Sequence, residues 1–315
     1  MSRHIVFGTG QVGRTVVEQL VASGEHVVAV NRSGRDELPG ARVVAADAAD
    51  SAVTTELCTG ADVVYFCLNA TRYDRWAEEF PPLQLGVLAG ASSAGARLVV
   101  LDNLYAYGPP RGRRLVETSS DNPTSAKAAT RAAMTQELLG AHRGGQVEVV
   151  IGRASDYFGP RTTHTALGET VFGAAVRGGT AQVMGDPDQP HSYSYTADVA
   201  AALILLGGAT TEATGQIWNL PVAPARTTRE MITDIYRLAG HQPRVLAAGR
   251  TTLRLLGLVK PELREYLHTL YQFTDPWIVD DTKFCAAFGV QATPSAESLA
   301  TTVTWFRDRD TVPVH

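Results

Sequence analysis

The chain has 315 residues, of which 44% are hydrophobic and 19% charged, and its formal net charge at pH 7 is −4. This composition is that of an ordinary globular protein, and the length suffices for one large domain or two lobes. The mildly acidic balance excludes a surface that recruits nucleic acid or anionic membranes as a whole. We therefore expect a small-molecule substrate and neither a nucleic-acid nor a membrane partner.

Three cysteines, Cys58, Cys67 and Cys285, are scattered along the chain. Their odd number and spacing argue against a disulfide framework and against zinc, so we expect no metal site. The first residues run directly into a strand without a signal-peptide pattern, and the longest apolar runs are too short to cross a bilayer. We expect a soluble protein in the reducing cytoplasm.

The first half of the chain alternates short apolar runs with segments of helical periodicity. Strands are expected at 4–8, 26–30, 42–47, 62–68, 97–103 and 147–153, and helices at 11–24, 51–57, 74–94 and 124–142. Pro81 and Pro82 should break or restart the third of these helices. Strands that are apolar on both faces and separated by helices indicate an α/β fold with a doubly wound parallel sheet, the Rossmann type.

After about Ala154 the alternation of strands and helices loosens. The expected elements are a helix at 169–179, a strand running into a helix at 191–208, a strand at 215–221 and a helix capped by Thr227 or Thr228. We predict a dinucleotide-binding domain over 1–153 with returning segments near 191–221. A smaller α+β substrate-binding lobe is predicted over 154–315, with the substrate in the cleft between the two.

The stretch GTGQVG follows the first strand and opens the first helix. In this context the first glycine allows a tight turn, the second lets the backbone approach a pyrophosphate, and the third lets helix and strand pack closely. The helix N-terminus then faces the phosphates. A plain glycine-rich turn is the alternative. The predicted phosphate-binding residues are Gly8, Thr9, Gly10, Gln11, Val12 and Gly13.

The second strand ends in VNRSGRDEL, where NAD-binding chains usually place an acid for the ribose 2′-hydroxyl. Arginine there can instead pair with a 2′-phosphate in two-point geometry, which favours NADP(H) over NAD(H). Asp36 and Glu37 come too late to serve as the strand-end acid. The predicted contacts are Asn31, Arg32, Ser33 and Arg35. The alternative is that the two arginines are solvated loop charges.

Taken in order, several motifs resemble those of the short-chain dehydrogenase/reductase superfamily, in its extended or atypical NAD-dependent epimerase/dehydratase-like group. The motifs are GTGQVG, ADAAD after the third strand, DNLYAYGP, RASDYFGP, HSYSYTADVA and WNLP. The resemblance runs nearly end to end and implies the fold and the cofactor class. It does not imply a substrate, because one fold hosts many functions.

The resemblance implies further cofactor contacts. Asp47 would meet the adenine edge or, as the alternative, serve as a loop carboxylate. Leu68, Asn69 and Ala70 would pass under the cofactor, Lys127 would bind the nicotinamide ribose, and Arg153 and Tyr157 would lie in the loop beside the nicotinamide.

Two positions depart from the pattern of the resembled group. The tyrosine four residues before the lysine is Pro123, and the serine or threonine five residues before Gly108 is Asn103. The ordinary Ser-Tyr-Lys proton relay therefore cannot operate, although a carbonyl reduction still needs a proton donor near the oxygen. Tyr105 is our candidate donor, and Asn103 could hold the carbonyl oxygen. Lys127 would stabilise the alkoxide or tune Tyr105.

Simpler roles compete with these assignments. Tyr105 could only pack, and Lys127 could only hold ribose hydroxyls. His164 and His191 lie in loops expected to face the cleft. Each could act as an acid near neutral pH, but we favour a role as a substrate contact or a structural histidine. The predicted substrate contacts are Asn69, Asn103, Tyr105, Tyr157, His164 and His191.

Three functions follow from the sequence. The first is an NADP(H)-dependent oxidoreductase that reduces a C=O or C=N bond, or an activated C=C bond, of a small organic substrate with an altered proton relay. The second is a sugar-nucleotide epimerase or dehydratase, and the third is an NADP-sensing binding protein without turnover. By resemblance, a homodimer would pair the helices near 74–94 and 124–142.

Overall fold

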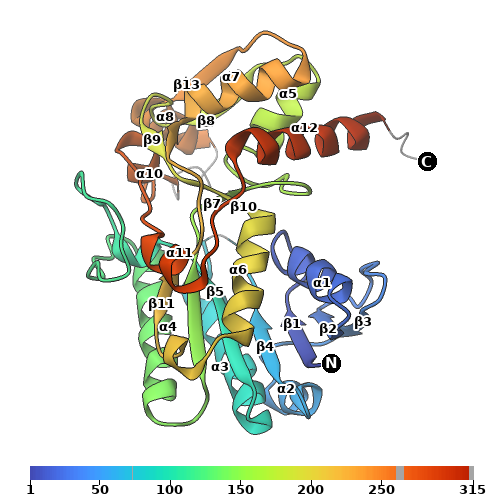
Figure 1. Ribbon diagram of the computed structural model, residues 1–315. Helices are drawn as coiled ribbons and strands as arrows, with labels where there is room; N and C mark the ends of the chain where they lie inside the picture. Colours follow the sequence, from blue (N-terminus) through green and yellow to red (C-terminus); the bar gives the residue numbers. More distant parts are fainter. Residues whose placement is uncertain (73, 260–265, 312–315) are drawn as a thin grey trace. The chain divides into compact units, whose positions relative to one another are not determined.

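The computed structural model describes residues 1–72, 74–259 and 266–311. The chain divides into two compact units, each with a hydrophobic core of its own (Figure 1). Unit 1 comprises Met1–Ala106, Ala126–Ala154 and Val199–Leu220. Unit 2 comprises Tyr107–Ser125, Ser155–Asp198 and Pro221–His315.

Unit 1 is built on a seven-stranded sheet in which every pairing is parallel. Its strands are β1 (Arg3–Phe7), β2 (His26–Asn31), β3 (Arg42–Ala45), β4 (Val63–Phe66), β5 (Arg97–Asp102), β6 (Val149–Arg153) and β11 (Ile217–Asn219). The order across the sheet is β3-β2-β1-β4-β5-β6-β11. The chain reverses direction across the sheet between β1 and β4, which is the topology of the doubly wound fold predicted from the sequence.

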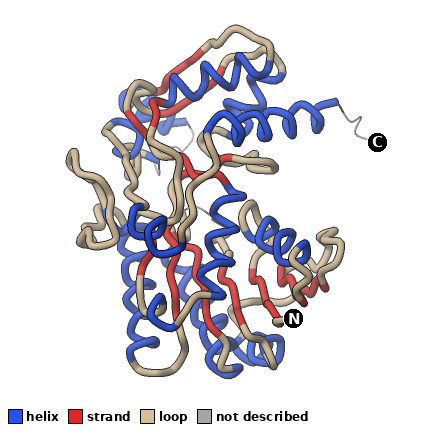
Figure 2. The backbone as a smooth tube through the Cα atoms, viewed as in Figure 1, coloured by secondary structure: helices blue, strands red, loops and turns tan. Residues whose placement is uncertain are grey.

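Helices cover both faces of this sheet, as Figures 1 and 2 show. They are α1 (Gly13–Ala22), α2 (Ser51–Cys58), α3 (Trp76–Ala94), α4 (Ala126–Arg143) and α6 (Thr196–Gly208). Short helical turns follow β5, as η1 (Tyr105–Tyr107), and α6, as η3 (Thr211–Ala213). Residues of α2, α3 and α4 share one core with the strands, and α6 lies on the other face, where Gly207 meets Tyr65. Two covered faces explain why the strands are apolar throughout.

The expected break in the third helix is wrong, because α3 continues through Pro81 and Pro82. Both prolines lie near the start of α3, so the missing N–H groups affect only its first turns. Tight packing on α2 holds the helix in place. Thr54 Oγ1 donates to the Gly86 carbonyl over 2.6 Å, and a Cβ on Gly90 would lie only 2.7 Å from the Thr54 carbonyl oxygen.

Unit 2 mixes short strands and helices, as expected for an α+β lobe. Its strands are β7 (Asp156–Phe158), β8 (Ala181–Met184), β9 (Pro190–His191), β10 (Tyr193–Tyr195), β12 (Arg226–Thr227) and β13 (Val245–Ala248). Its helices are η2 (Gly168–Gly173), α5 (Ala174–Val176), α7 (Thr228–Ala239), α8 (Arg250–Val259), α10 (Tyr271–Thr274), α11 (Thr282–Phe288) and α12 (Ser295–Thr311). Thr227 caps α7 in a reciprocal pair with Glu230, as predicted.

Among the described residues, no helix is long and apolar enough to cross a bilayer.

Candidate functional site

The turn between β1 and α1 can be made only by glycine at two of its positions. Gly8 has φ +97°, its N–H donates to the Val30 carbonyl over 2.8 Å, and a Cβ on it would lie 2.6 Å from the Cys67 carbonyl oxygen. A Cβ on Gly13 would lie 1.9 Å from the Gly8 carbonyl oxygen. These contacts give the first and third glycines the structural roles predicted for them.

The middle of this turn is open. Gly10 is exposed, and a Cβ there would meet no protein atom within 4 Å. Packing therefore does not demand glycine at this position, whereas close approach of a ligand would. Val12, the residue before α1, gives no side-chain cap, although the N–H of Arg14 in the first turn donates to the Gly10 carbonyl over 3.0 Å. The start of a helix is nevertheless a place where backbone N–H groups and the helix dipole favour an anion.

A tight turn after β2 is organised by the side chain of Asn31. Its Oδ1 accepts the N–H groups of Ser33 over 3.0 Å and Gly34 over 2.6 Å, and its Nδ2 donates to Thr9 Oγ1 over 2.9 Å. The same Nδ2 donates to Asp36 Oδ2 over 2.7 Å, and Thr9 Oγ1 donates to that oxygen as well. The carboxylate of Asp36 thus returns to the end of β2, which its distance in sequence did not predict.

Two arginines flank this turn as exposed cations. Arg32 Nη1 lies 3.4 Å from Thr71 Oγ1, and the backbone N–H of Arg35 donates to Ser33 Oγ over 3.3 Å. Across the described ranges, no ion pair joins either guanidinium to a carboxylate. The end of β2 therefore carries two uncompensated positive charges and one bound carboxylate.

The other residues predicted at the adenine edge or under the cofactor lie after β3 and β4. Asp47 is exposed, and its Oδ1 accepts the N–H of Ala49 over 2.9 Å, as the loop-carboxylate alternative requires. Leu68 and Ala70 are half-buried and pack on the core, whereas Asn69 is exposed. Asn69 is therefore the side chain of this segment that a ligand could contact.

The residues predicted for catalysis belong to unit 1. Asn103 directly follows β5, and its Oδ1 accepts the backbone N–H of Tyr105 over 2.9 Å. The half-buried Tyr105 ring stacks on Trp76 with ring centres 5.5 Å apart and planes 11° from parallel. Lys127 is buried in the first turn of α4. In a sheet of this topology, the loop after β5 and the start of α4 lie at the carboxyl edge, where such folds bind ligands.

A buried ionic cluster lies directly beneath these residues, at the last pairing of β5 with β6. Asp102 Oδ1 accepts from Arg131 Nε over 2.8 Å and lies 2.6 Å from Arg131 Nη2. Asp102 Oδ2 accepts from Arg153 Nε over 3.0 Å and from Thr135 Oγ1 over 3.3 Å. Burial alone would raise the pKa of the Asp102 carboxyl, but the guanidinium groups of Arg131 and Arg153 outweigh it and hold the pKa below its ordinary value.

Sequence reasoning found only part of this cluster. Arg153 was predicted beside the nicotinamide, but its side chain is fully buried on Asp102. Asp102 and Arg131 were missed, although Arg131 follows Lys127 by four residues and so shares its helix face. That spacing is the signal that could have found it.

The predicted substrate contacts of unit 2 differ in exposure. His164 is exposed and Tyr157 is half-buried in β7. His191 is only 2% exposed, its Nδ1 lies 3.0 Å from the Gln272 carbonyl oxygen, and its Nε2 lies 2.8 Å from Asp156 Oδ2. Both ring nitrogens thus face protein acceptors, which fits the structural alternative for this histidine.

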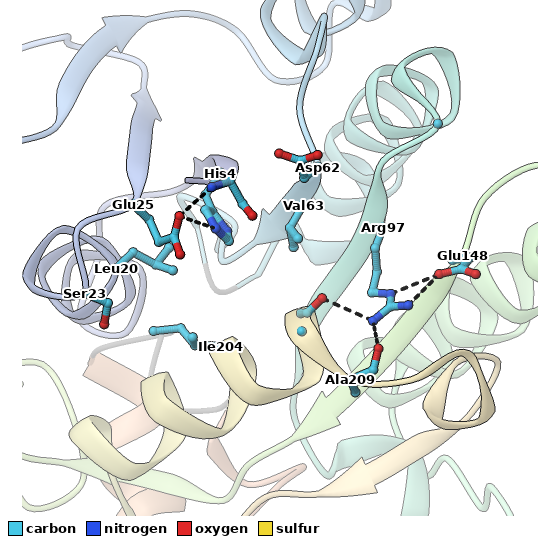
Figure 3. A pocket seen from close by; sticks show the side chains of 14 residues that line it. His4, Leu20, Ser23, Glu25, Asp62, Val63, Arg97, Glu148, Ile204 and Ala209 are labelled. Carbon is cyan, nitrogen blue, oxygen red and sulfur yellow. Dashed lines mark hydrogen bonds and ion pairs between the residues drawn. The ribbon is translucent and has the colours of Figure 1, made fainter.

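A cavity of about 520 Å³ lies at the opposite, amino edge of the unit 1 sheet (Figure 3). Arg97 in its wall is bound by Glu148 over 2.7 Å and by carbonyl groups at the end of α6, including that of Ala209. Glu25 Oε2 accepts the backbone N–H of Ser2 over 2.6 Å. Charged groups in this wall are therefore bound to backbone groups and to each other within the fold. No sequence pattern predicted a site here.

A scan against protein-family models matches residues 5–220 to the NAD-dependent epimerase/dehydratase family. The chain belongs to this family. The match confirms the resemblance seen in the motifs, and it spans the turn between β1 and α1, the end of β5, α4 and β11. A nicotinamide dinucleotide is the cofactor class that this membership supports.

Solved structures of similar fold cover nearly the whole chain. DesIV, a dTDP-glucose 4,6-dehydratase from Streptomyces venezuelae with NAD and TYD bound, has 22% identity, 97% coverage of each chain and a TM-score of 0.78. The UDP-glucose 4-epimerase of Thermus thermophilus, in complex with NAD, has 21% identity, covers 98% of this chain and 100% of its own, and has a TM-score of 0.78. No curated protein matches the chain.

Proposed function

We propose that this family member is an NADP(H)-dependent oxidoreductase that reduces a C=O or C=N bond, or an activated C=C bond, of a small organic substrate. One observation carries the proposal. Asn103, Tyr105 and Lys127 all belong to unit 1 around the carboxyl end of β5, while the usual tyrosine position is Pro123, which has no proton to give. The chain keeps a polar site for the cofactor and changes the proton donor.

The dinucleotide would be held by the turn between β1 and α1, with its pyrophosphate over Gly10 and the first turn of α1. The exposed guanidinium groups of Arg32 and Arg35, with the Ser33 hydroxyl, support a 2′-phosphate at the end of β2. Asp36 opposes it there, because a carboxylate repels a phosphate and accepts a ribose hydroxyl. The NADP(H) preference therefore rests on two cations outweighing one anion.

A nicotinamide cofactor, when bound, would supply the hydride for the substrate carbon. The substrate oxygen then needs a proton, and we assign its delivery to the Tyr105 phenol, which regains a proton from solvent. Because Asn103 Oδ1 is bonded to the N–H of Tyr105, its Nδ2 is the group that would donate to the oxygen. Lys127 would stabilise the negative charge on the oxygen or on the phenolate.

An imine substrate would suit this relay well, since an imine can bind already protonated and then needs less proton donation from the protein. Sugar-nucleotide epimerisation or dehydration is the second candidate, because the solved structures of similar fold include enzymes with those names. It ranks lower because Pro123 removes the usual base. An NADP sensor without turnover is the third candidate.

The test is to follow the consumption of NADPH by the purified chain with aldehydes, ketones and cyclic imines, beside titrations of NADPH and NADP⁺ binding. Oxidation of NADPH by one substrate class would establish the reductase and name the functional group. Tight binding without oxidation would reject it in favour of the sensor. Conversion of a sugar nucleotide without net consumption of NADPH would favour the second candidate.

A further inference from the structure

One face of α4 carries polar side chains in place of apolar ones. Lys127, Arg131 and Thr135 follow one another at intervals of four residues and are 5%, 4% and 2% exposed. Residues at this spacing line up along a helix, and the stripe that faces a sheet is normally apolar. The stripe runs from Thr135 in the middle of α4 to Lys127 in its first turn.

The middle of this stripe is fixed from three sides. The Arg131 guanidinium binds the Asp102 carboxylate, donates through Nη2 to the Leu101 carbonyl over 3.3 Å, and lies 4.6 Å from the centre of the Phe80 ring. Asp102 is also bound by Arg153 at the end of β6. One carboxylate therefore joins α4, β5 and β6 at their shared edge.

Stability does not account for this arrangement. Two guanidinium groups and the carboxylate they share are all buried, and removing charged groups from water carries a cost that an apolar cluster of equal size would avoid. Arg131 Nη1 is buried and has no hydrogen-bond partner in the part of the chain that the structure describes. Because this buried ionic cluster costs stability and lies at the edge of a candidate site, we expect it to have a functional role.

The neighbours of the cluster indicate that role. Asp102 directly precedes Asn103, and Arg131 lies one helical turn after Lys127. We propose that Asp102 and Arg131 are positioning residues, which hold the first turn of α4 against the end of β5 and thereby set Lys127 and Asn103 in register for the cofactor and substrate. This inference rests on the proposed function in taking Lys127 as a cofactor contact and Asn103 as a substrate contact.

A double-mutant cycle tests the proposal with a readout that a purely structural role would not move. The variants are Arg131→Met, Lys127→Ala and their combination, and the measurements are the dissociation constant of NADPH and the melting temperature. If Arg131 acts through Lys127, Arg131→Met weakens NADPH binding at least about fivefold in the native chain and less than about twofold in the Lys127→Ala background. Equal losses in both backgrounds would overturn the proposal.

Arg97→Met is the control, because Arg97 makes an ion pair at the other end of β5, with the more exposed Glu148. It should lower the melting temperature and leave NADPH binding unchanged. Weakening of binding by the control as large as that by Arg131→Met would show a general loss of structure and contradict the assignment.

Arg131→Lys keeps a cation at the cluster and serves if the methionine variant does not fold. It should recover part of the binding and show the same dependence on Lys127. The NADPH titration decides this inference even if the native chain oxidises no NADPH, an outcome that would reject only the reductase. A native chain that fails to bind NADPH would overturn both.

Discussion

The two edges of the unit 1 sheet use charge in opposite ways. At the amino edge, Arg97 is matched by Glu148 and by helix-end carbonyls (Figure 3). Glu25 accepts the N–H of Ser2 there. At the carboxyl edge, the exposed Arg32 has no carboxylate partner among the described residues, and two buried guanidinium groups converge on the Asp102 carboxylate. The exposed Arg32 and the buried Asp102 cluster thus lie at the carboxyl edge, which is where a parallel sheet of this type binds ligands.

The largest effect should come from Tyr105→Phe. Loss of its phenolic proton should slow NADPH oxidation by roughly 100- to 10,000-fold, the usual contribution of a general acid, with the Trp76 stacking preserved. Tyr65→Phe, whose hydroxyl lies 3.4 Å from His4 Nδ1 at the amino edge, is the control and should leave the rate unchanged. Steady-state kinetics decide the matter. An unaltered rate for Tyr105→Phe removes this residue from the mechanism.

The next effect concerns the end of β2. Arg32→Ala should weaken NADPH binding by about 1.5–3 kcal/mol, the value of a charge-assisted contact, and leave NADH nearly unchanged. Asp36→Asn should strengthen NADPH binding roughly twofold to fivefold, because it removes a repelling charge. Fluorescence titrations with both cofactors measure these changes. Equal losses for NADPH and NADH in Arg32→Ala would contradict the 2′-phosphate assignment.

A pair of glycine substitutions separates packing from binding in the turn after β1. Gly13→Ala places a Cβ on the Gly8 carbonyl oxygen and should destabilise the chain by about 1–3 kcal/mol, as overpacking does. Gly10→Ala meets no protein atom, so it should leave stability unchanged and weaken dinucleotide binding. Urea unfolding and NADPH titration measure the two effects. Unchanged binding in Gly10→Ala would show that the pyrophosphate lies elsewhere.

The smallest effect is a pH dependence at the amino edge. Burial lowers the pKa of His4 below its ordinary 6.5, although Glu25 and Asp62 act in the raising direction. The folded chain therefore prefers neutral His4, and this stability is present above pH 6.5 and lost as the pH falls through the lower, folded pKa. His4→Gln should flatten the fall in melting temperature over that window without altering NADPH binding. An identical pH profile in the variant would refute this source.

Much of unit 1 followed from local patterns, because strands that are apolar on both faces can only be buried in a parallel sheet. The turn between β1 and α1 could also be predicted from the sequence, since Gly8 and Gly13 meet steric demands that no other residue satisfies. The continuity of α3 through Pro81 could not be predicted in this way, because α3 is held by packing against α2, which is a tertiary effect.

At the candidate site, sequence reasoning failed where side chains reach across the fold. The return of Asp36 to Thr9 depends on the turn made by Asn31, not on a fixed distance from β2. The Asp102–Arg131 pair joins residues 29 positions apart, and an acid at the end of an apolar strand does not indicate which residue pairs with it.

The central claim, that a site without the usual tyrosine still reduces a substrate, is tested most directly by hydride transfer. The native chain would be incubated with NADPH deuterated at the transferable position and the aldehyde, ketone and imine panel, and the products analysed by mass spectrometry. The account predicts one deuterium in the reduced product for each NADPH consumed. Bound NADPH with no deuterated product, or a converted sugar nucleotide with no NADPH consumed, would contradict it.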